Sequence, residues 1–180
     1  FNQAIQLNPK NAAVYNSRGL AYYNNKAYDK AIADYNKAIQ LDPKYALAYN
    51  NRGLASYYKG APDKAIADYN KAIELDPKYA IAYVNRGMAY YYGRVFDKSL
   101  ADFNKAIDLN QNFSVAYNYR GLLNFEKKEY DKAIADYTKA IQYNQNYAVA
   151  YNNRGYAYLY ENAYDKAIAD YDKAIELNPK

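Results

Sequence analysis

Tyr49-Asn50-Asn51-Arg52-Gly53 recurs every thirty-four residues along this chain of 180 residues. The equivalent stretches are residues 15–19, 83–87, 117–121 and 151–155, and each begins with tyrosine and ends with arginine-glycine. A fixed period of this length is typical of repeat proteins, in which each unit packs only against its neighbours. We therefore expect one continuous array of units and not a set of separate globular domains.

Each period holds the patterns of two helices. In the first unit, residues 12 to about 25 place apolar side chains at helical spacing and predict a first helix. Residues 29–41 carry an apolar stripe at the same spacing and predict a second helix. Asp29 is expected to be the N-cap or a first-turn acid of that helix. Pro43 is expected to end it, because proline disfavours helical backbone in the residue before it.

The units follow one another without a linker, and their expected bounds are 12–45, 46–79, 80–113, 114–147 and 148–180. Residues 1–11 match the tail of a second helix and are expected to belong to a truncated earlier repeat. The chain opens inside a helical pattern without an initiator methionine, so we interpret it as a piece of a longer protein. In the third and fourth units Gln111 and Gln145 replace the closing proline, which predicts slightly longer second helices there.

Glycine and tyrosine recur at positions that predict close helix packing. Gly19 and its copies lie in the middle of first helices, where glycine costs about 1 kcal/mol relative to alanine. Such a cost is tolerable where the missing side chain lets another helix approach closely. Most of the 27 tyrosines are expected to fill the core and the seams around these contacts.

This pattern resembles the tetratricopeptide repeat, which combines aromatic, glycine, alanine and proline positions. In the first unit the matching residues are Tyr15, Gly19, Tyr22, Ala31, Tyr35, Ala38 and Pro43. Tyrosine replaces the leading tryptophan and arginine replaces the leucine before each glycine. The resemblance implies an all-α fold, a right-handed superhelix of antiparallel helix pairs with the first helices on its concave face. It also implies a non-catalytic protein-interaction scaffold.

Arginine and aspartate recur together, one of each per unit. We predict that they form bidentate ion pairs of structural importance, within or between units. The expected pairs are Arg18 with Asp34, Arg52 with Asp68, Arg86 with Asp102, Arg120 with Asp136, and Arg154 with Asp170.

Composition narrows the functional class. The chain has no cysteine and no histidine, which excludes disulfides, Cys/His zinc sites and a histidine general base. No phosphate loop, nucleophile motif or metal cluster is legible, so we expect no catalysis, cofactor or metal. The net charge is +5, but the lysines and acids concentrate in second helices and turns, so no nucleic acid partner is expected. No apolar run approaches the ~20 residues of a membrane span, and no membrane partner is expected.

The first helices are expected to line a neutral groove. Positions one helical turn apart, away from Tyr15 and Gly19, should face it. They are Ala13, Asn16, Leu20, Tyr23, Leu47, Asn50, Leu54, Tyr57, Ile81, Val84, Met88, Tyr91, Val115, Asn118, Leu122, Phe125, Val149, Asn152, Tyr156 and Leu159, and beside them run Asn51, Asn85 and Asn153, interrupted by Ser17 and Tyr119.

Asparagine amides both donate to and accept from peptide bonds, so a periodic row of them can hold an extended backbone of any sequence. We therefore expect the groove to bind an extended peptide or partner segment. The simpler interpretation is that these asparagines cap turns or are merely exposed. A different function is also open, in which chains stack end to end through Phe1, Ala4 and Ile5 at one end and Ile175 and Leu177 at the other.

Overall fold

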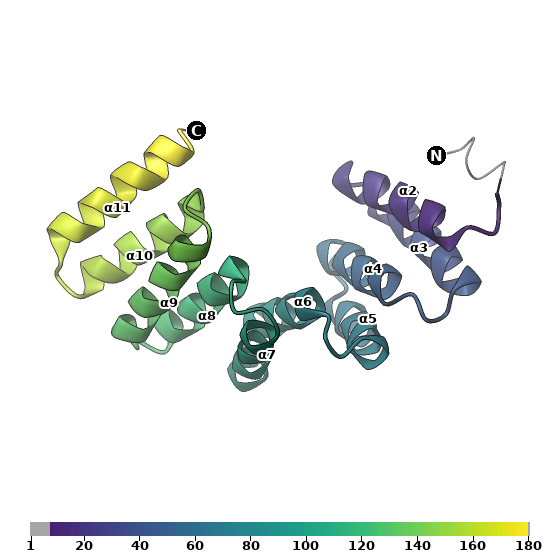
Figure 1. Ribbon diagram of the computed structural model, residues 1–180, viewed down its shortest axis with the longest axis horizontal. Coiled ribbons are helices and arrows are strands. Elements are labelled where there is room, and N and C mark those ends of the chain that lie inside the picture. Colours follow the sequence, from purple (N-terminus) through teal and green to yellow (C-terminus); the bar gives the residue numbers. More distant parts are fainter. Residues whose placement is uncertain (1–7, 180) are drawn as a thin grey trace. The chain divides into compact units, whose positions relative to one another are not determined.

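The computed structural model describes residues 8–179, and every regular element in that range is an α-helix (Figure 1). The all-α prediction is confirmed. The first helices of the units each have 13 residues and are α2 (Ala12–Asn24), α4 (Ala46–Tyr58), α6 (Ala80–Tyr92), α8 (Ser114–Glu126) and α10 (Ala148–Tyr160). The second helices each have 14 residues and are α3 (Tyr28–Leu41), α5 (Pro62–Leu75), α7 (Phe96–Leu109), α9 (Tyr130–Tyr143) and α11 (Tyr164–Leu177). Residues 1–7 of the expected earlier repeat, with the apolar Phe1, Ala4 and Ile5, lie outside the described residues.

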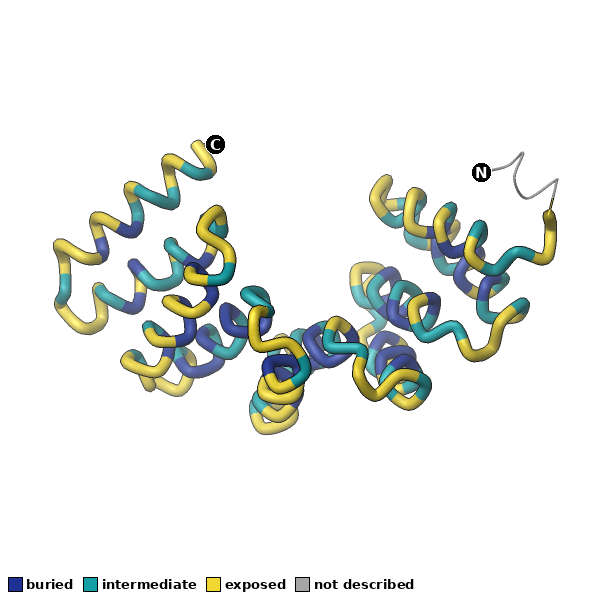
Figure 2. The backbone as a smooth tube through the Cα atoms, viewed as in Figure 1, coloured by how far each residue is buried: buried dark blue, intermediate teal, exposed yellow. Residues whose placement is uncertain are grey.

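Contacts divide the chain into two compact units, Phe1–Ala89 and Tyr90–Lys180, with the boundary inside α6. In the first, α2 pairs with α3 and α4 with α5, and α4 also packs against α3 and α2. In the second, α8 packs against both α7 and α9, and α10 packs against α9, α11 and α8. The helices α4, α8 and α10 therefore each lie between the second helix of their own repeat and that of the repeat before it. Buried and exposed segments alternate along each helix, as expected when one face is packed (Figure 2).

The turn inside each repeat closes through one residue in the left-handed region. These residues are Lys26, Gly60, Arg94, Lys128 and Asn162, with φ between 57° and 87°. Left-handed backbone is strained for residues other than glycine and asparagine. Three of the five turns are therefore strained, at Lys26, Arg94 and Lys128. The following helix has no side-chain cap at Ala27, and Asp29 lies in its first turn, which settles the role of that acid.

The second helices of the third and fourth repeats are not longer, and that prediction was wrong. α7 ends at Leu109 and α9 at Tyr143, with the same 14 residues as α3. The stop signal is the asparagine or aspartate that follows the helix. Asn110 Oδ1 accepts a hydrogen bond from the backbone N–H of Asn112 at 3.1 Å, as Asp42 Oδ1 does from Lys44 at 2.9 Å. This side-chain turn ends the helix without proline.

The mid-helix glycines lie against tyrosine rings of the second helices. A Cβ atom on Gly19 would lie 2.7 Å from Tyr35 Cε1, and one on Gly121 would lie 2.6 Å from Tyr137 Cε1. Both rings are fully buried. Alanine would overlap with the ring at these positions, so glycine is required by the packing and not by the turn geometry. The core and seam expectation was made for most tyrosines, and five fall outside it because they are exposed: Tyr58, Tyr92, Tyr156, Tyr160 and Tyr164.

Candidate functional site: the surface of the first helices

Arginine and aspartate of one repeat form bidentate pairs. Arg18 donates from Nε to Asp34 Oδ2 at 2.7 Å and from Nη2 to Oδ1 at 2.6 Å. The same two bonds join Arg52 to Asp68, Arg120 to Asp136 and Arg154 to Asp170. The aspartates are buried, and hydrogen bonding to them raises the pKa of each of these four arginines above its usual value. Asp102 is also buried, in α7.

The guanidinium groups also reach the preceding repeat and the tyrosine that opens the motif. Arg52 Nη1 donates to Asn36 at 2.7 Å and Arg86 Nη1 to Asn70 at 2.6 Å. Arg52 Cζ lies 5.4 Å from the ring centre of Tyr49, within the range of a cation–π contact. Tyrosine and arginine of the recurring motif therefore belong to the architecture, and they hold adjacent helices together.

The asparagines of the motif hydrogen-bond to each other between repeats. Asn51 Nδ2 donates to Asn16 Oδ1 at 3.0 Å, and Asn85 Nδ2 donates to Asn50 Oδ1 at 2.9 Å. In the second unit, Asn153 Nδ2 donates to Asn118 Oδ1 at 3.0 Å. The three acceptors are buried, with exposed fractions of 5%, 3% and 2% for Asn16, Asn50 and Asn118. The two neighbouring positions are therefore different: one is a buried acceptor and the other a half-buried donor.

The sequence itself supports this pairing. The third repeat has Val84 at the acceptor position and the fourth has Tyr119 at the donor position, so both partners of the third such pair are replaced. Val84 is buried, and the Tyr119 ring stacks on Phe103 at 5.8 Å. Asn152 is at the acceptor position of the last repeat and is exposed. The joint replacement at positions 84 and 119 was a sequence signal for this pairing between repeats. The five-residue motif, taken one copy at a time, does not show it.

Exposed apolar side chains concentrate on the first helices. Within residues 8–179, large exposed hydrophobic residues on these helices are Leu20, Leu47, Tyr58, Ile81, Tyr92, Val149, Tyr156, Leu159 and Tyr160. None of the described residues of α3, α5, α7 or α9 is in this class. The first helices also carry no charge except the motif arginine and Glu126. Their exposed surface is therefore neutral and partly apolar, whereas α3, α5, α7 and α9 expose charged residues and α11 also exposes Tyr164, Ile168 and Ile175.

In the first unit, four of the predicted groove residues meet in one small hollow. Leu54, Tyr57, Asn85 and Met88 line it, and its volume of about 10 Å³ is that of a single water-sized site. Tyr23 lies in a neighbouring cluster of rings, 5.8 Å from both Tyr28 and Tyr58. Burial of the Tyr23 phenol raises its pKa to about 12, with further contributions from the adjacent tyrosines.

In the second unit, the predicted groove residues Tyr91 and Phe125 lie in two separate aromatic sites. Tyr91 lines a pocket of about 350 Å³ with Phe96 and Glu126. Phe125 lies in an aromatic cluster with Tyr156 and Tyr160, at 5.2 Å from each ring. In each unit, rings at the ends of the first helices thus form a partly exposed edge. Tyr23, Tyr57, Tyr91, Phe125 and Tyr156 were expected to face the groove, whereas Tyr58, Tyr92 and Tyr160 were not. In the sequence, adjacent aromatic pairs such as Tyr91-Tyr92 could have indicated these rings at the helix ends, because two neighbouring rings on a helix cannot both face the core.

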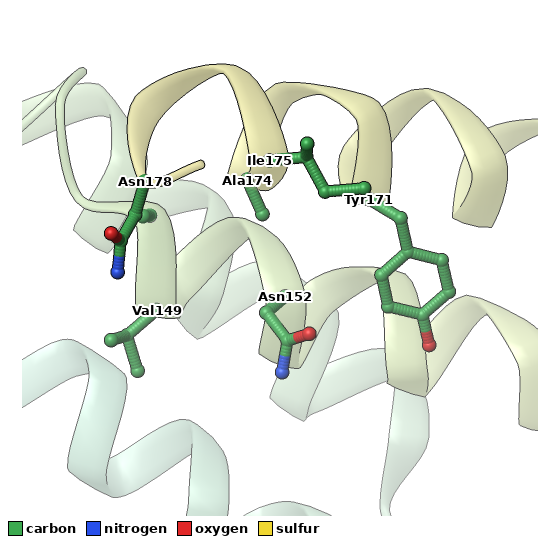
Figure 3. Close-up of a pocket in the computed structure, with 7 residues that line it drawn as sticks. Val149, Asn152, Tyr171, Ala174, Ile175 and Asn178 are labelled. Carbon is green, nitrogen blue, oxygen red and sulfur yellow. The ribbon is translucent and has the colours of Figure 1, made fainter. Parts of the chain in front are cut away.

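A larger pocket, of about 390 Å³, lies between α10 and α11. Figure 3 shows Val149 and Asn152 of α10 on one side and Tyr171 and Ile175 of α11 on the other. Ile175 is 63% exposed, whereas its equivalents Ile107 and Ile141 are each 8% exposed. The pocket lies on the face that, in the preceding repeat, packs against the next first helix.

The described residues contain no group of histidine, cysteine or acidic side chains that could hold a metal ion. No helix among them is long and apolar enough to cross a membrane.

Family models match the repeats directly. Models described as tetratricopeptide repeat match residues 12–45, 46–79, 80–113 and 148–180, and a further TPR repeat model matches residues 121–160. The chain belongs to the tetratricopeptide repeat family. Such repeats build protein-interaction scaffolds, and protein or peptide partners are therefore the class expected for this tetratricopeptide protein.

Solved structures share the fold of this tetratricopeptide array. The MamA protein is 29% identical, with 94% of this chain and 92% of that chain covered and a TM-score of 0.74. YrrB, described as a TPR protein with an unusual peptide-binding site, is 24% identical over 100% of this chain and 93% of its own, with a TM-score of 0.69. The APC/C Cut9–Hcn1 structure gives a TM-score of 0.91 at 21% identity, covering 99% of this chain and 36% of that one. The search of curated proteins found no match.

Proposed function

We propose that the first helices bind an extended segment of a partner protein and that the chain acts without catalysis. The observation that carries this proposal is the exposed apolar stripe on neutral helices. In the first unit, it includes Leu20, Leu47 and Ile81, whose exposed fractions are 43%, 38% and 47%. An apolar surface on helices whose only charges are the motif arginine and Glu126 favours a segment of protein over nucleic acid, which would require a basic lining.

The half-buried asparagines supply the polar part of this surface. Asn85 uses one N–H for Asn50, which leaves a second N–H and the carbonyl oxygen for a peptide bond of the ligand. Asn153 lies at an equivalent position, and so does Asn51, whose Oδ1 atom also accepts a hydrogen bond from Asn50 Nδ2 at 3.3 Å. Asn16, Asn50 and Asn118 are the buried acceptors of these three donors. The proposed contact residues are thus fewer than the sequence suggested, and the buried row positions them.

The test uses peptides selected on the wild-type protein from a random peptide library. Leu47→Asp together with Ile81→Asp adds charge to the stripe at exposed positions, and we expect at least about a tenfold loss of peptide affinity. Ala33→Asp together with Ala67→Asp is the matched control, since both alanines are exposed on second helices. Equal binding of the selected peptides by both double variants would refute the proposal.

A second candidate function is supported by the pocket between α10 and α11. We propose, as the alternative, that this face packs against a first helix of another copy of the chain, as α9 packs against α10. The strong exposure of Ile175 relative to Ile141 supports it. Sedimentation at rising protein concentration should show a dimer that Ile175→Asp abolishes. A monomer at all concentrations would rule this alternative out without affecting the peptide proposal.

A further inference from the structure

A tyrosine ring occupies the same place in three of the five repeats. Tyr22, Tyr90 and Tyr158 are equivalent residues of the first helices. A lysine of the second helix lies over each ring: Lys30 at 5.8 Å, Lys98 at 5.4 Å and Lys166 at 5.5 Å from the ring centre. The motif arginine also contacts two of these rings, with Arg18 and Arg154 each at 5.9 Å. The chain thus builds a cation–π site for a phenol ring from its own residues.

The fourth repeat has the cations of this site but not the ring. Asn124 replaces the tyrosine, and its Nδ2 atom donates to Asp136 Oδ2 at 2.9 Å. A pocket of about 450 Å³ lies at this place, and its lining includes Arg120, Asn124 and Lys132. None of the described residues that line it is aromatic. The Cζ atom of Arg120 lies 5.4 Å from the ring centre of Tyr117, a residue of the preceding helical turn.

We propose that this pocket binds a tyrosine side chain presented by a partner protein. The occupant follows from three other repeats, where the equivalent lysine contacts a phenol ring, and from two of these, where the equivalent arginine contacts the ring as well. Lys132 pairs with Glu129 at 2.8 Å, but both side chains are exposed, and such pairs contribute little to stability. The lysine can therefore turn over an incoming ring, as Lys98 does over Tyr90.

Charge and polarity select a phenol over other groups. Arg120 is neutralised by Asp136 and Lys132 by Glu129, so the pocket offers little unbalanced positive charge for an anion. Lys127 and Glu129 line it as well and can bind the phenol hydroxyl. A purely aliphatic side chain would gain no cation–π contact and would leave these polar groups without a partner.

This site is separate from the peptide groove. Arg120 and Asn124 lie on the face of α8 opposite to Asn118 and Phe125, since successive helical residues are 100° apart. The pocket also includes residues of α7 and α9, on either side of α8. The inference therefore does not depend on the proposed function, and a partner could use both surfaces at once.

The experiment follows backbone amide shifts of nitrogen-15-labelled protein during titration with N-acetyl-L-tyrosinamide. We expect saturable shifts at Asn104, Asn124 and Lys132, and at most about a tenth of that response with N-acetyl-L-leucinamide. Asn124→Tyr fills the pocket with the chain's own ring and should weaken binding at least about tenfold. Lys105→Tyr is the matched control, because it adds a ring at an exposed position of α7 outside the pocket.

Lys132→Ala gives a second measurement that does not depend on repacking, since this lysine is exposed. It should weaken tyrosinamide binding severalfold and leave the thermal midpoint unchanged. Wild-type binding by Asn124→Tyr would overturn the proposal. Equal shifts with leucinamide, or saturable shifts that map away from the pocket, would overturn it as well.

Discussion

Asn51 donates a hydrogen bond from its side-chain amide to Oδ1 of Asn16, a residue of the preceding repeat, over a distance of 3.0 Å. The bond from Asn85 to Asn50 repeats this relationship one period later. In a repeat array, stability is the sum of the intrinsic stability of each unit and of the interfaces between neighbours. These amide pairs are part of the interface term.

Replacing the buried acceptor should therefore destabilise the protein. Asn50→Ala removes the partner of Asn85 and leaves a half-buried N–H without its acceptor. We expect the free energy of unfolding to fall by about 1–3 kcal/mol, measured by urea denaturation. Asn152→Ala is the control, because Asn152 occupies the equivalent position but is exposed. Equal losses in the two variants would contradict the structural role of the amide pair.

The mid-helix glycines should differ in their response to alanine. A Cβ on Gly121 would lie 2.6 Å from the buried Tyr137 ring, whereas one on Gly155 would lie 3.1 Å from the half-buried Tyr171. Overpacking costs about 1–3 kcal/mol, and alanine regains about 1 kcal/mol of helix propensity in both cases. Gly121→Ala should be more destabilising than Gly155→Ala by at least about 1 kcal/mol in thermal or urea unfolding. A reversed order would show that the Tyr137 ring can move aside.

The Arg52–Asp68 pair should matter more than the pairs on the surface. Asp68→Ala removes two hydrogen bonds of 2.9 and 2.5 Å from a partly buried guanidinium. We expect a loss of about 1.5–3 kcal/mol in the free energy of unfolding. Asp29→Ala removes the exposed ion pair with Lys59 and should leave stability unchanged within error. High salt should not change the Asp68→Ala result greatly, because the Asp68 carboxylate is shielded from solvent.

Alkaline pH should unfold the protein. Burial raises the pKa of Tyr35, Tyr69 and Tyr137 above the usual value of 10.0, and that of Tyr23 to about 12. Above pH 10 the unfolded chain releases these phenolic protons while the folded chain retains them, so the unfolded state binds fewer protons and stability falls as pH rises. Helical circular dichroism should be lost above about pH 10, together with a step of tyrosinate absorbance that comes from these buried rings. Tyrosinate formation at these buried rings without loss of helix would contradict the expected coupling.

Much of the fold could be predicted from the motif because the period repeats in register. Each copy places tyrosine, arginine and glycine at the same helical positions, and each arginine has one aspartate sixteen residues later. The same regularity indicated close contacts at Gly19 and Gly121, which the structure shows against tyrosine rings. Helix ends were harder to predict, since Asn110 stops α7 through a side-chain turn and no proline is needed.

The two asparagines of the opening motif show the limit of such prediction. Asn50 and Asn51 are adjacent, so they lie 100° apart on the helix, and the same residue type at both gives no contrast between a packed and an open position. The rotation of α4 against its neighbours decides the outcome: Asn50 is buried and Asn51 is half-buried. That rotation depends on how rings such as Tyr69 fill the space beside Gly53.

The sequence by itself determined the period, the helix pairs, the family and the arginine–aspartate partners, because each of these is written in residue types at fixed spacing. Only the tertiary structure decided which amides are buried, which tyrosines are exposed and that a pocket lies beside Asn124 in the fourth repeat. Those properties depend on side chains from neighbouring repeats, and the space that one repeat leaves for another cannot be read from either repeat alone.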